Sequence, residues 1–350
     1  MRTIKIKVCG HNGEDEFSYG YPFIRALQRH YHVEFSDDPD YLFTNDSSIE
    51  YLDYNCVKIF YTGENEHPNF NLFDYAISFD HMEFGDRHFR FPVHQMAVFY
   101  NPNDVQNAGD LDFKTPHEFT KSDLVKKTEF CSFVYSNYLT DNARDDFFKQ
   151  LSQYKLVNSG GRYKNNVGGP VVSKLEFEKK HKFSIAFENS SREGYTTEKI
   201  FCSLAADTIP IYFGDPLIGE TFNEGRFINA MKYPNFEAVV DRVKEIDQND
   251  ELYLAIMKEH VLNTGIDFAK DREDFTSFLR HIIDQPLNEA RRVHINPARL
   301  KVFEENERII MSIRLRKHNF RMFLAFLYRP FKKIQKLEEI KIALFRKMKL

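Results

Sequence analysis

Short apolar runs alternate with segments of helical spacing along most of this chain, and this alternation constrains its fold more than any other feature. Runs of five or six residues, typical of buried strands, occupy 4–9, 57–61, 75–79, 130–135, 154–158, 183–187 and 208–213. Apolar residues spaced by three and four predict helices over 21–30, 142–153, 197–206, 236–246, 251–263 and 273–283. Such alternation predicts an α/β fold with parallel sheets, in which ligands bind where strands lead into helices.

The chain is long enough for more than one domain. Its 350 residues correspond to about two domains of ordinary size. Between residues 101 and 127 the apolar pattern gives way to Asn, Asp, Pro, Lys and Thr, a composition typical of connections. We therefore expect an N-terminal domain over 1–120, a second domain over 121–300 and a helical tail over 301–350.

The tail carries charge of the opposite sign to the rest of the chain. Residues 312–350 hold twelve Lys and Arg against two Glu, a net charge of +10, whereas the whole chain carries −4. Apolar residues with Lys or Arg between them predict a basic amphipathic helix, which Pro330 divides into two pieces. Two interpretations remain open: the helix lies on an anionic membrane surface, or it packs back on the domains with its basic side in solvent.

No segment predicts export or a membrane-spanning helix. Residues 1–8 alternate like a strand and lack the continuous apolar run of a secretory signal, and no uncharged apolar stretch reaches about eighteen residues. The four cysteines are widely scattered, as in a reducing compartment. We therefore expect a cytoplasmic protein, peripheral at the inner membrane if the tail binds lipid. The main body has no basic, aromatic-rich surface pattern that would indicate nucleic acid.

The segment 183–200 combines a strand, a polar loop and the start of a helix. Backbone N–H groups, a hydroxyl cap and the ammonium group of Lys199 come together where the helix begins. A helix N-terminus with a cation beside it suits a diphosphate. Glu198 has two possible roles there: a favourable charge at the positive end of the helix, or an acceptor for ribose hydroxyls. A second strand, 208–213, ends in a Gly-Asp-Pro turn at the same sheet edge, so we expect a nucleotide site at this edge.

Three motifs in fixed order make this site more specific. Residues 187–190 (Phe-Glu-Asn-Ser), 194–199 (Gly-Tyr-Thr-Thr-Glu-Lys) and 208–214 (Thr-Ile-Pro-Ile-Tyr-Phe-Gly) resemble the donor-binding signature of the α1,3/4-fucosyltransferases, glycosyltransferase family 10. Residues 60–66 (Phe-Tyr-Thr-Gly-Glu-Asn-Glu) and the following 68–77 resemble the acceptor-side motif of its bacterial members. The resemblance covers roughly residues 55–265.

The resemblance implies a fold and a reaction. The fold is of the GT-B type, with two Rossmann-like domains facing across a cleft and the nucleotide held by the second. The reaction is an inverting single displacement that moves L-fucose from GDP-β-L-fucose to GlcNAc or Glc of N-acetyllactosamine-type or lactose-type acceptors, as in Lewis antigen synthesis on a lipopolysaccharide. GDP-fucose is a co-substrate, and the acceptor glycan is the second small-molecule partner. One general base is then required, with no covalent sugar intermediate.

The resemblance also assigns roles to five residues, and a sixth candidate, Asn189, ends the strand before the loop that follows residue 187. Glu64 matches the family's catalytic carboxylate and is expected to take the proton of the acceptor hydroxyl. Lys199 and Arg144 supply positive charge for the leaving diphosphate, with Tyr195 as a hydroxyl partner. Glu198 binds the ribose of GDP, and Asn189 is expected to form hydrogen bonds in the donor loop.

Alternatives remain open for Glu64 and Arg144. Glu66 is the rival base, and either carboxylate is otherwise a solvated turn acid. Arg144 is otherwise a surface helix residue paired with Asp145 or Asp146.

No metal-ligand pattern stands out. Asp38-Pro-Asp40 and Asp110-Leu-Asp112 have the Asp-x-Asp form that holds a divalent ion in many sugar transferases, but both are interpreted as solvated turns. We therefore expect catalysis without an obligatory metal or other cofactor. Two further hypotheses stay open: another GT-B sugar transferase that uses a different nucleotide-sugar, or a membrane-associated carbohydrate-binding protein without transferase activity.

Overall fold

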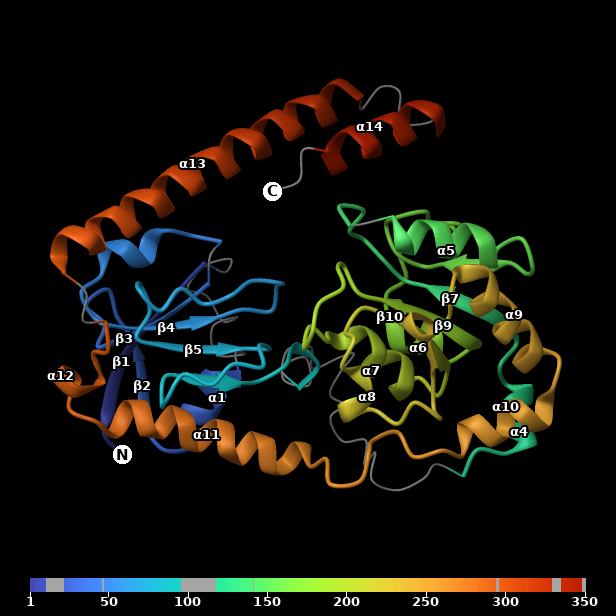
Figure 1. Cartoon of the computed structure of the whole chain (residues 1–350), viewed down its shortest axis with the longest axis horizontal. Coiled ribbons are helices and arrows are strands. Elements are labelled where there is room, and N and C mark those ends of the chain that lie inside the picture. The colour runs from blue at the N-terminus through green and yellow to red at the C-terminus, as the bar shows by residue number, and fades with distance from the viewer. Residues whose placement is uncertain are drawn as a thin grey trace. The chain divides into compact units, whose positions relative to one another are not determined.

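Two compact units, each built on a parallel sheet, make up the chain (Figure 1). The computed structural model describes residues 1–10, 22–45, 47–95, 118–140, 142–293, 296–328 and 335–347. One unit comprises Met1–Phe91 with Phe268–Leu350, and the other comprises Pro92–Asp267. This division differs from the predicted bounds 1–120, 121–300 and 301–350, because the segment after residue 267 belongs to the unit formed by the N-terminal residues. Most of the predicted connection over 101–127 lies outside the described residues.

The first unit contains a six-stranded parallel sheet of order β2-β1-β3-β4-β5-β6. Its strands are β1 (Thr3–Cys9), β2 (His32–Phe35), β3 (Tyr41–Thr44), β4 (Val57–Tyr61), β5 (Tyr75–Ser78) and β6 (His88–Arg90). Its helices are α1 (Pro22–Gln28), η2 (Glu50–Asp53), α11 (Phe268–Asp284), α12 (Leu287–Ala290), α13 (Pro297–Tyr328) and α14 (Gln335–Lys347). The sequence missed β2, β3 and β6, which are too short to give a periodic signal.

Helix α11 belongs to this unit because its apolar stripe packs on the sheet. Phe275 of α11 stacks on Phe91 with ring centroids 4.3 Å apart, and Phe278 stacks on Phe89 at 5.3 Å. Tyr41 of β3 donates a hydrogen bond to the carbonyl of Ile283, 3.1 Å away. These contacts join residues about two hundred positions apart, which no local pattern reveals.

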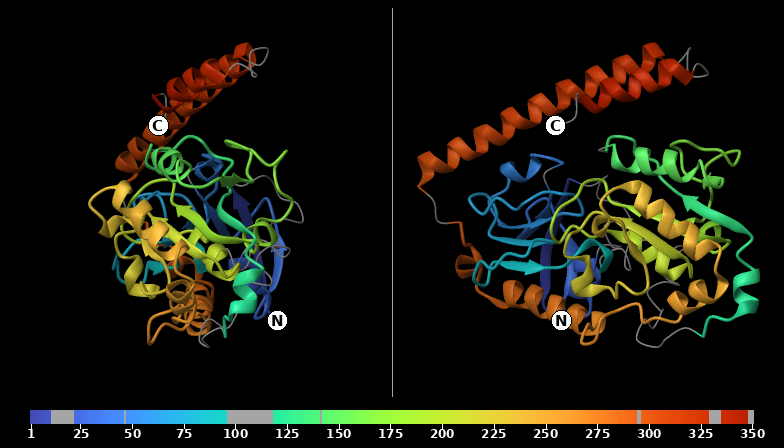
Figure 2. Two further views of the ribbon diagram at one scale, coloured as in Figure 1. Left: turned by 90° about the vertical axis from the view of Figure 1, so that its right-hand side faces the viewer. Right: turned by 45° about the vertical axis from the view of Figure 1, so that its right-hand side comes forward.

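The tail forms two helices, as its amphipathic pattern indicates. Helix α13 starts on the first unit, where Leu300 and Phe303 pack against a core cluster that includes Cys9, Leu42 and Phe60. Arg308 and Arg314 of α13 form ion pairs with Asp53 and Glu66 at 3.0 and 3.6 Å. Figure 2 shows α13 as one long helix with α14 folded back beside it. Pro330, the predicted break, lies outside the described residues. Among the described residues no helix is long and apolar enough to cross a membrane.

The second unit contains a five-stranded parallel sheet of order β11-β10-β9-β7-β8. Its strands are β7 (Glu129–Phe133), β8 (Val157–Ser159), β9 (His181–Phe187), β10 (Ile209–Phe213) and β11 (Ile228–Asn229). Its helices are α4 (Lys121–Val125), α5 (Ala143–Leu151), α6 (Lys174–Glu178), α7 (Glu198–Ala205), α8 (Ile218–Thr221), η3 (Ala230–Lys232), α9 (Phe236–Asp247) and α10 (Asp250–Met257). The strand predicted over 154–158 begins at Val157, since Tyr154 and Lys155 lie in the turn that ends α5.

Two helical layers cover this sheet. Helices α5 and α9 contact each other on one face, where the rings of Phe147, Phe187 and Phe236 pack together. Helices α6 and α7 contact each other on the other face, and Ile200 and Leu204 of α7 are buried there (Figure 1). The predicted Rossmann-like architecture is confirmed, because each unit contains a parallel sheet with helical crossovers, such as α1 between β1 and β2 and α7 between β9 and β10.

Candidate functional site

The second unit has a topological switch point between β7 and β9. The chain passes from β7 outward to β8 and then returns to β9 on the other side of β7, so the strand order reverses there. Ligands of open α/β sheets bind at the carboxyl ends of strands at such a point. The chain leaving β7 leads to Arg144 in α5, and the chain leaving β9 continues into Glu188, Asn189 and the loop that ends at α7.

Arg144 lies buried at this switch point, with only 1% of its surface exposed. Its Nη2 donates to the carbonyls of Phe187 and Glu188, both at 3.2 Å, and to Oδ1 of Asn189 at 2.8 Å. The guanidinium lies 3.8 Å from the ring centroid of Tyr135. Arg144 is therefore not the surface helix residue of the alternative interpretation, and it joins the ends of β7 and β9.

The loop of residues 188–197, called the donor loop after its predicted role, ends with a charged cluster at the start of α7. Glu188 and Lys199 are buried there, whereas the side chain of Glu198 is 42% exposed. Thr197 is the N-cap residue, but its side chain makes no capping hydrogen bond, contrary to the predicted hydroxyl cap. Its hydroxyl and its N–H instead donate to the carboxylate of Glu188, at 2.6 and 2.8 Å. Nζ of Lys199 lies 2.8 Å from Oγ1 of Thr197, 3.2 Å from Oε2 of Glu188 and 3.6 Å from Oε1 of Glu198.

These neighbours fix the charges of the cluster. Burial acts against the ammonium form of Lys199, but the carboxylates of Glu188 and Glu198 outweigh it and raise the pKa of Lys199 above its ordinary value. The side chain of Glu198 is 42% exposed, and its partial burial acts to raise its pKa, but the positive charges of Lys199 and Lys174 outweigh this effect and lower the pKa to about 2. At neutral pH the α7 start therefore presents an ammonium group and a carboxylate, groups that bind phosphates and hydroxyls respectively.

A second carboxylate, Asp215, anchors the middle of the donor loop. Its Oδ1 accepts from the N–H of Gly194 and its Oδ2 from the hydroxyl of Thr196, at 2.8 and 2.7 Å. Gly194 has a φ of +78°, a conformation that L side chains rarely adopt. Asp215 follows β10, so the loop between β9 and α7 is fixed from the neighbouring strand.

The structure brings together Arg144 and Asn189, and separately Glu198 and Lys199, within one strand-end region of the second unit. Tyr195 lies in the same loop and is buried. No role for Tyr135 or Asp215 was predicted from the sequence, and Glu188 was noted only as part of the motif 187–190. Glu188 lies inside the motif 187–190 and Asp215 directly follows the motif 208–214, so the carboxylates in and next to these motifs were the available signal. Nothing in the sequence marks Tyr135, because its contact with Arg144 joins two separate elements.

Glu64 lies in the first unit, in the loop that follows β4. Its N–H donates to Oγ1 of Thr62 at 3.0 Å, and its carbonyl accepts from the N–H of Glu66 at 2.9 Å, so the chain turns tightly there. The side chain of Glu64 is exposed, whereas Glu66 is partly buried and pairs with Arg314. Glu64 is thus the more accessible of the two candidate bases.

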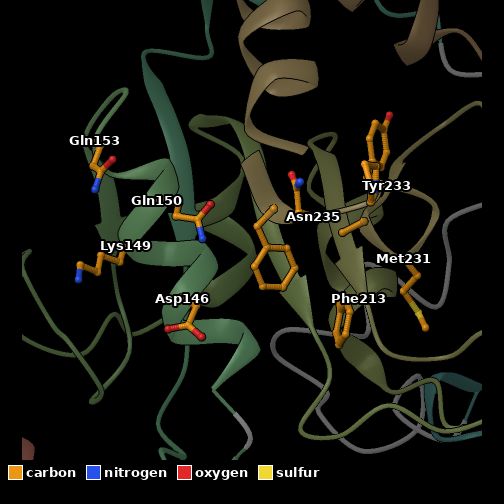
Figure 3. Close-up of a pocket in the computed structure, with 11 residues that line it drawn as sticks. Asp146, Lys149, Gln150, Gln153, Phe213, Met231, Tyr233 and Asn235 are labelled. Atoms are coloured by element: carbon orange, nitrogen blue, oxygen red, sulfur yellow. The ribbon is translucent and has the colours of Figure 1, made fainter. Parts of the chain in front are cut away.

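A groove of about 660 Å³ lies elsewhere in the second unit (Figure 3). Asp146, Lys149 and Gln150 of α5 line one side with Gln153, which follows this helix, and residues 230, 231 and 233–236 line the other. None of the six predicted site residues lines it. Among the described residues, no group of three or more His, Cys, Asp or Glu side chains is placed to hold a metal ion. Asp38 lies in an exposed turn, and the pair Asp110 and Asp112 lies outside the described residues.

Comparisons with known proteins agree with this division of the chain. Residues 10–97 match the family model of the α-(1,3)-fucosyltransferase FucT N-terminal domain, and residues 124–261 match that of the glycosyltransferase family 10 (fucosyltransferase) C-terminal region. The chain is 36% identical over 295 residues to α-(1,3)-fucosyltransferase FucT of Helicobacter pylori, which is 75% of this chain and 61% of that protein. The chain therefore spans less than two thirds of the length of this relative.

Solved structures extend the comparison to the fold. A crystal structure of an α1,3-fucosyltransferase with GDP-fucose is 30% identical and superposes with a TM-score of 0.66, covering 85% of this chain and 94% of that one. A crystal structure of an α1,3-fucosyltransferase with GDP is 28% identical, with a TM-score of 0.68 over 85% of this chain and 93% of that one. Because both family regions match in order and a fucosyltransferase of known structure is covered over nearly its whole length, this chain belongs to glycosyltransferase family 10, the fucosyltransferases.

Proposed function

We propose that this protein transfers L-fucose from GDP-β-L-fucose to GlcNAc or Glc of an N-acetyllactosamine-type or lactose-type acceptor, through α1,3 or α1,4 linkage. The observation that carries the proposal is the strand-end region of the second unit, where Arg144 contacts Asn189 and where Glu198 pairs with Lys199 at the start of α7. Tyr195 lies in the loop between them. A relative of similar fold was crystallised with GDP-fucose. Membership of family 10 points to the same donor.

Two cations, Lys199 at the start of α7 and Arg144 in α5, suit the leaving diphosphate. Lys199 keeps its charge because two carboxylates raise its pKa. Nε of Arg144 is buried and has no hydrogen-bond partner among the described residues. A buried N–H group without a hydrogen-bond acceptor costs free energy, and a phosphate oxygen of GDP-fucose would accept a hydrogen bond from it. The carboxylate of Glu198 is proposed to accept hydrogen bonds from the ribose hydroxyls.

The proposed reaction is a single displacement with inversion. Glu64 takes the proton of the acceptor hydroxyl while that oxygen forms a bond to the anomeric carbon of fucose. The bond between this carbon and the β-phosphate oxygen breaks, and GDP leaves with the electron pair. Lys199 and Arg144 offset the charge that develops on the diphosphate. No metal is required in this scheme.

The tail is proposed to bind an anionic membrane surface, which would place the enzyme at the cytoplasmic side of the inner membrane with lipid-linked glycans as acceptors. Basic residues alternate there with apolar side chains that are at least 40% exposed: Ile309, Ile310, Ile313, Leu315, Phe320, Met322, Phe323, Phe326 and Leu327. A chain ending at Lys317 keeps the Arg314–Glu66 pair. It should lose binding to anionic vesicles at low salt while retaining turnover on a soluble acceptor. Lost turnover would instead indicate a tail needed for the fold.

The test of the proposed activity is release of GDP from GDP-fucose with N-acetyllactosamine as acceptor, in the presence of EDTA. We expect turnover in the parent and a loss of several orders of magnitude in Glu64→Gln, with GDP affinity by calorimetry unchanged. Glu66→Gln is the matched control and should retain most of the activity. GDP-mannose and UDP-galactose should not replace the donor. An inactive parent contradicts the proposal, and an active Glu64→Gln moves the base to another residue.

A further inference from the structure

His67 lies three residues beyond Glu64 in the same loop, and a buried carboxylate holds its imidazole. Nδ1 of His67 is 2.7 Å from Oδ1 of Asp80, with 61% of the His67 side chain exposed against 7% for Asp80. Asp80 follows β5, which pairs in parallel with β4, so both residues lie beyond carboxyl ends of adjacent strands. The contact therefore spans two strand-end loops.

The carboxylate is itself fixed by β5. Oγ of Ser78, the last residue of β5, donates to Oδ2 of Asp80 at 2.9 Å and accepts from the N–H of Asp80 at 3.2 Å. Nε2 of His88 also lies 2.9 Å from this hydroxyl, and Nδ1 of His88 lies 2.9 Å from the carbonyl of Met82. A buried carboxylate that Ser78 holds through Oδ2 presents Oδ1 to the imidazole in a fixed position, which limits the orientations of the ring.

This arrangement determines what the ring can do. A carboxylate only accepts hydrogen bonds, so Nδ1 of His67 carries the proton that points at Asp80. In the neutral ring Nε2 then has its lone pair and accepts a hydrogen bond. Nε2 lies on the opposite side of the ring from the buried carboxylate. A sugar hydroxyl is a donor of the kind that this atom accepts.

We propose that His67, oriented by Asp80, is an acceptor-binding residue whose Nε2 accepts a hydrogen bond from a hydroxyl group of the acceptor sugar. The inference rests on the proposed function, because it takes the Glu64 loop as the place where the acceptor hydroxyl is deprotonated. An acceptor that reaches Glu64 contacts this short loop, in which His67 is the exposed ring. Asp80 acts through His67 and is a positioning residue.

The experiment measures acceptor KM for N-acetyllactosamine and for its monodeoxy analogues, in the parent and in His67→Ala. One hydrogen bond corresponds to about a three- to tenfold change. We expect the acceptor KM to rise by that factor in His67→Ala, with the KM for GDP-fucose unchanged. One deoxy analogue should show the same rise in the parent and no further rise in His67→Ala, the coupling expected of two groups in contact.

Asp80→Asn tests the orientation of the ring. The amide group that replaces the carboxylate would donate to Nδ1 of His67, so Nε2 would carry the proton and the coupling to the same hydroxyl should disappear. If Asp80→Asn does not fold, the comparison of the parent with His67→Ala on N-acetyllactosamine and its deoxy analogues tests the proposal by itself. His32→Ala, an exposed histidine in β2 of the same unit, is the matched control and should leave all the KM values unchanged.

The outcomes separate this inference from the proposed function. If the parent transfers fucose, Glu64→Gln does not, and His67→Ala leaves acceptor KM and all couplings unchanged, the role of His67 is refuted and the proposed function stands. An equal rise in KM for every analogue would also refute the hydroxyl contact. If the parent transfers no fucose to any acceptor, both proposals fail.

Discussion

Oε2 of Glu188 lies 3.2 Å from Nζ of Lys199, so the cation proposed to meet the donor diphosphate is already paired with a buried carboxylate. Glu188 also accepts two hydrogen bonds from Thr197, the N-cap residue of α7. The pair therefore sets both the position of Lys199 and the first turn of the helix. A lysine fixed before the donor binds loses less side-chain entropy on binding.

Glu188→Gln should destabilise the protein by about 3 kcal/mol, because it removes one partner of a buried ion pair. Urea unfolding measures this loss. The Glu188→Gln substitution should also reduce the rise in melting temperature that GDP binding causes, because Lys199 is then held less firmly. Glu237→Gln, at an exposed position in the first turn of α9, is the control and should stay within about 0.5 kcal/mol of the parent. A Glu188→Gln variant as stable as the parent would show that the pair adds no stability.

Arg144→Lys should weaken GDP binding and lower stability by at least about 2 kcal/mol. A lysine cannot reproduce the planar fork that reaches the carbonyls of Phe187 and Glu188 and the side chain of Asn189. Buried acceptors left unpaired cost about 1–3 kcal/mol each. Calorimetric titration with GDP and urea unfolding measure the two effects.

Arg242→Lys provides the comparison for Arg144→Lys. Arg242 lies on α9 with its side chain 31% exposed and pairs with Glu245 at 2.6 Å. Its replacement should change neither GDP affinity nor the urea midpoint appreciably, because exposed ion pairs contribute little. Equal effects of the two substitutions would contradict a special role for the buried arginine.

Arg87→Lys should loosen the segment that follows Glu64. Arg87 donates to the carbonyls of Phe70, Phe73 and Asp74 at 2.7 to 3.0 Å, and its guanidinium lies 5.0 Å from the ring centroids of Phe70 and Phe84. We expect turnover to fall and acceptor KM to rise, while GDP affinity is unchanged because the proposed GDP site lies in the other unit. Kinetics on N-acetyllactosamine with parallel GDP titration provide the measurement. A fall in GDP affinity as large as the fall in turnover would argue against this local effect.

The sequence predicted the parallel α/β layers because buried strands and amphipathic helices have distinct periods. It also predicted that 183–199 forms a strand, a loop and the start of a helix, which the bounds of β9 and α7 confirm. Local pattern was insufficient where the contacts are distant in sequence. Helix α11 is recognisable as a helix, but only the stacking of Phe275 on Phe91 shows which unit it joins.

The same limit applies to the site. Glu198 and Lys199 were predictable because a helix start and its first-turn charges lie together in the sequence. The burial of Arg144 was not, since its partners Tyr135 and Asn189 come from two other strand ends. A charged residue in the first turn of a helix is most often solvated, and burial depends on which strands lie next to it.

Stability should fall with acidification below about pH 6.5, with His181 as one cause. Burial lowers the pKa of His181 below its ordinary value of 6.5, against the opposing effect of the Phe177 carbonyl. Nδ1 of His181 lies 2.8 Å from this carbonyl, and Nε2 lies 3.1 Å from the amide nitrogen of Asn158. The buried ring is therefore neutral. As pH falls below 6.5, the unfolded chain binds a proton at this histidine more readily than the folded one.

One such group changes the free energy of unfolding by at most about 1.4 kcal/mol per pH unit. His181→Asn keeps a donor for the Phe177 carbonyl and has no titratable group, so its free energy of unfolding should depend less on pH between 7.5 and 5.5. Some dependence should remain, because burial also lowers the pKa of His88. Urea unfolding at both pH values measures the difference, and His260→Asn, at an exposed position, should behave as the parent. If His181→Asn shows the same pH dependence as the parent, then His181 binds protons equally in the folded and unfolded states.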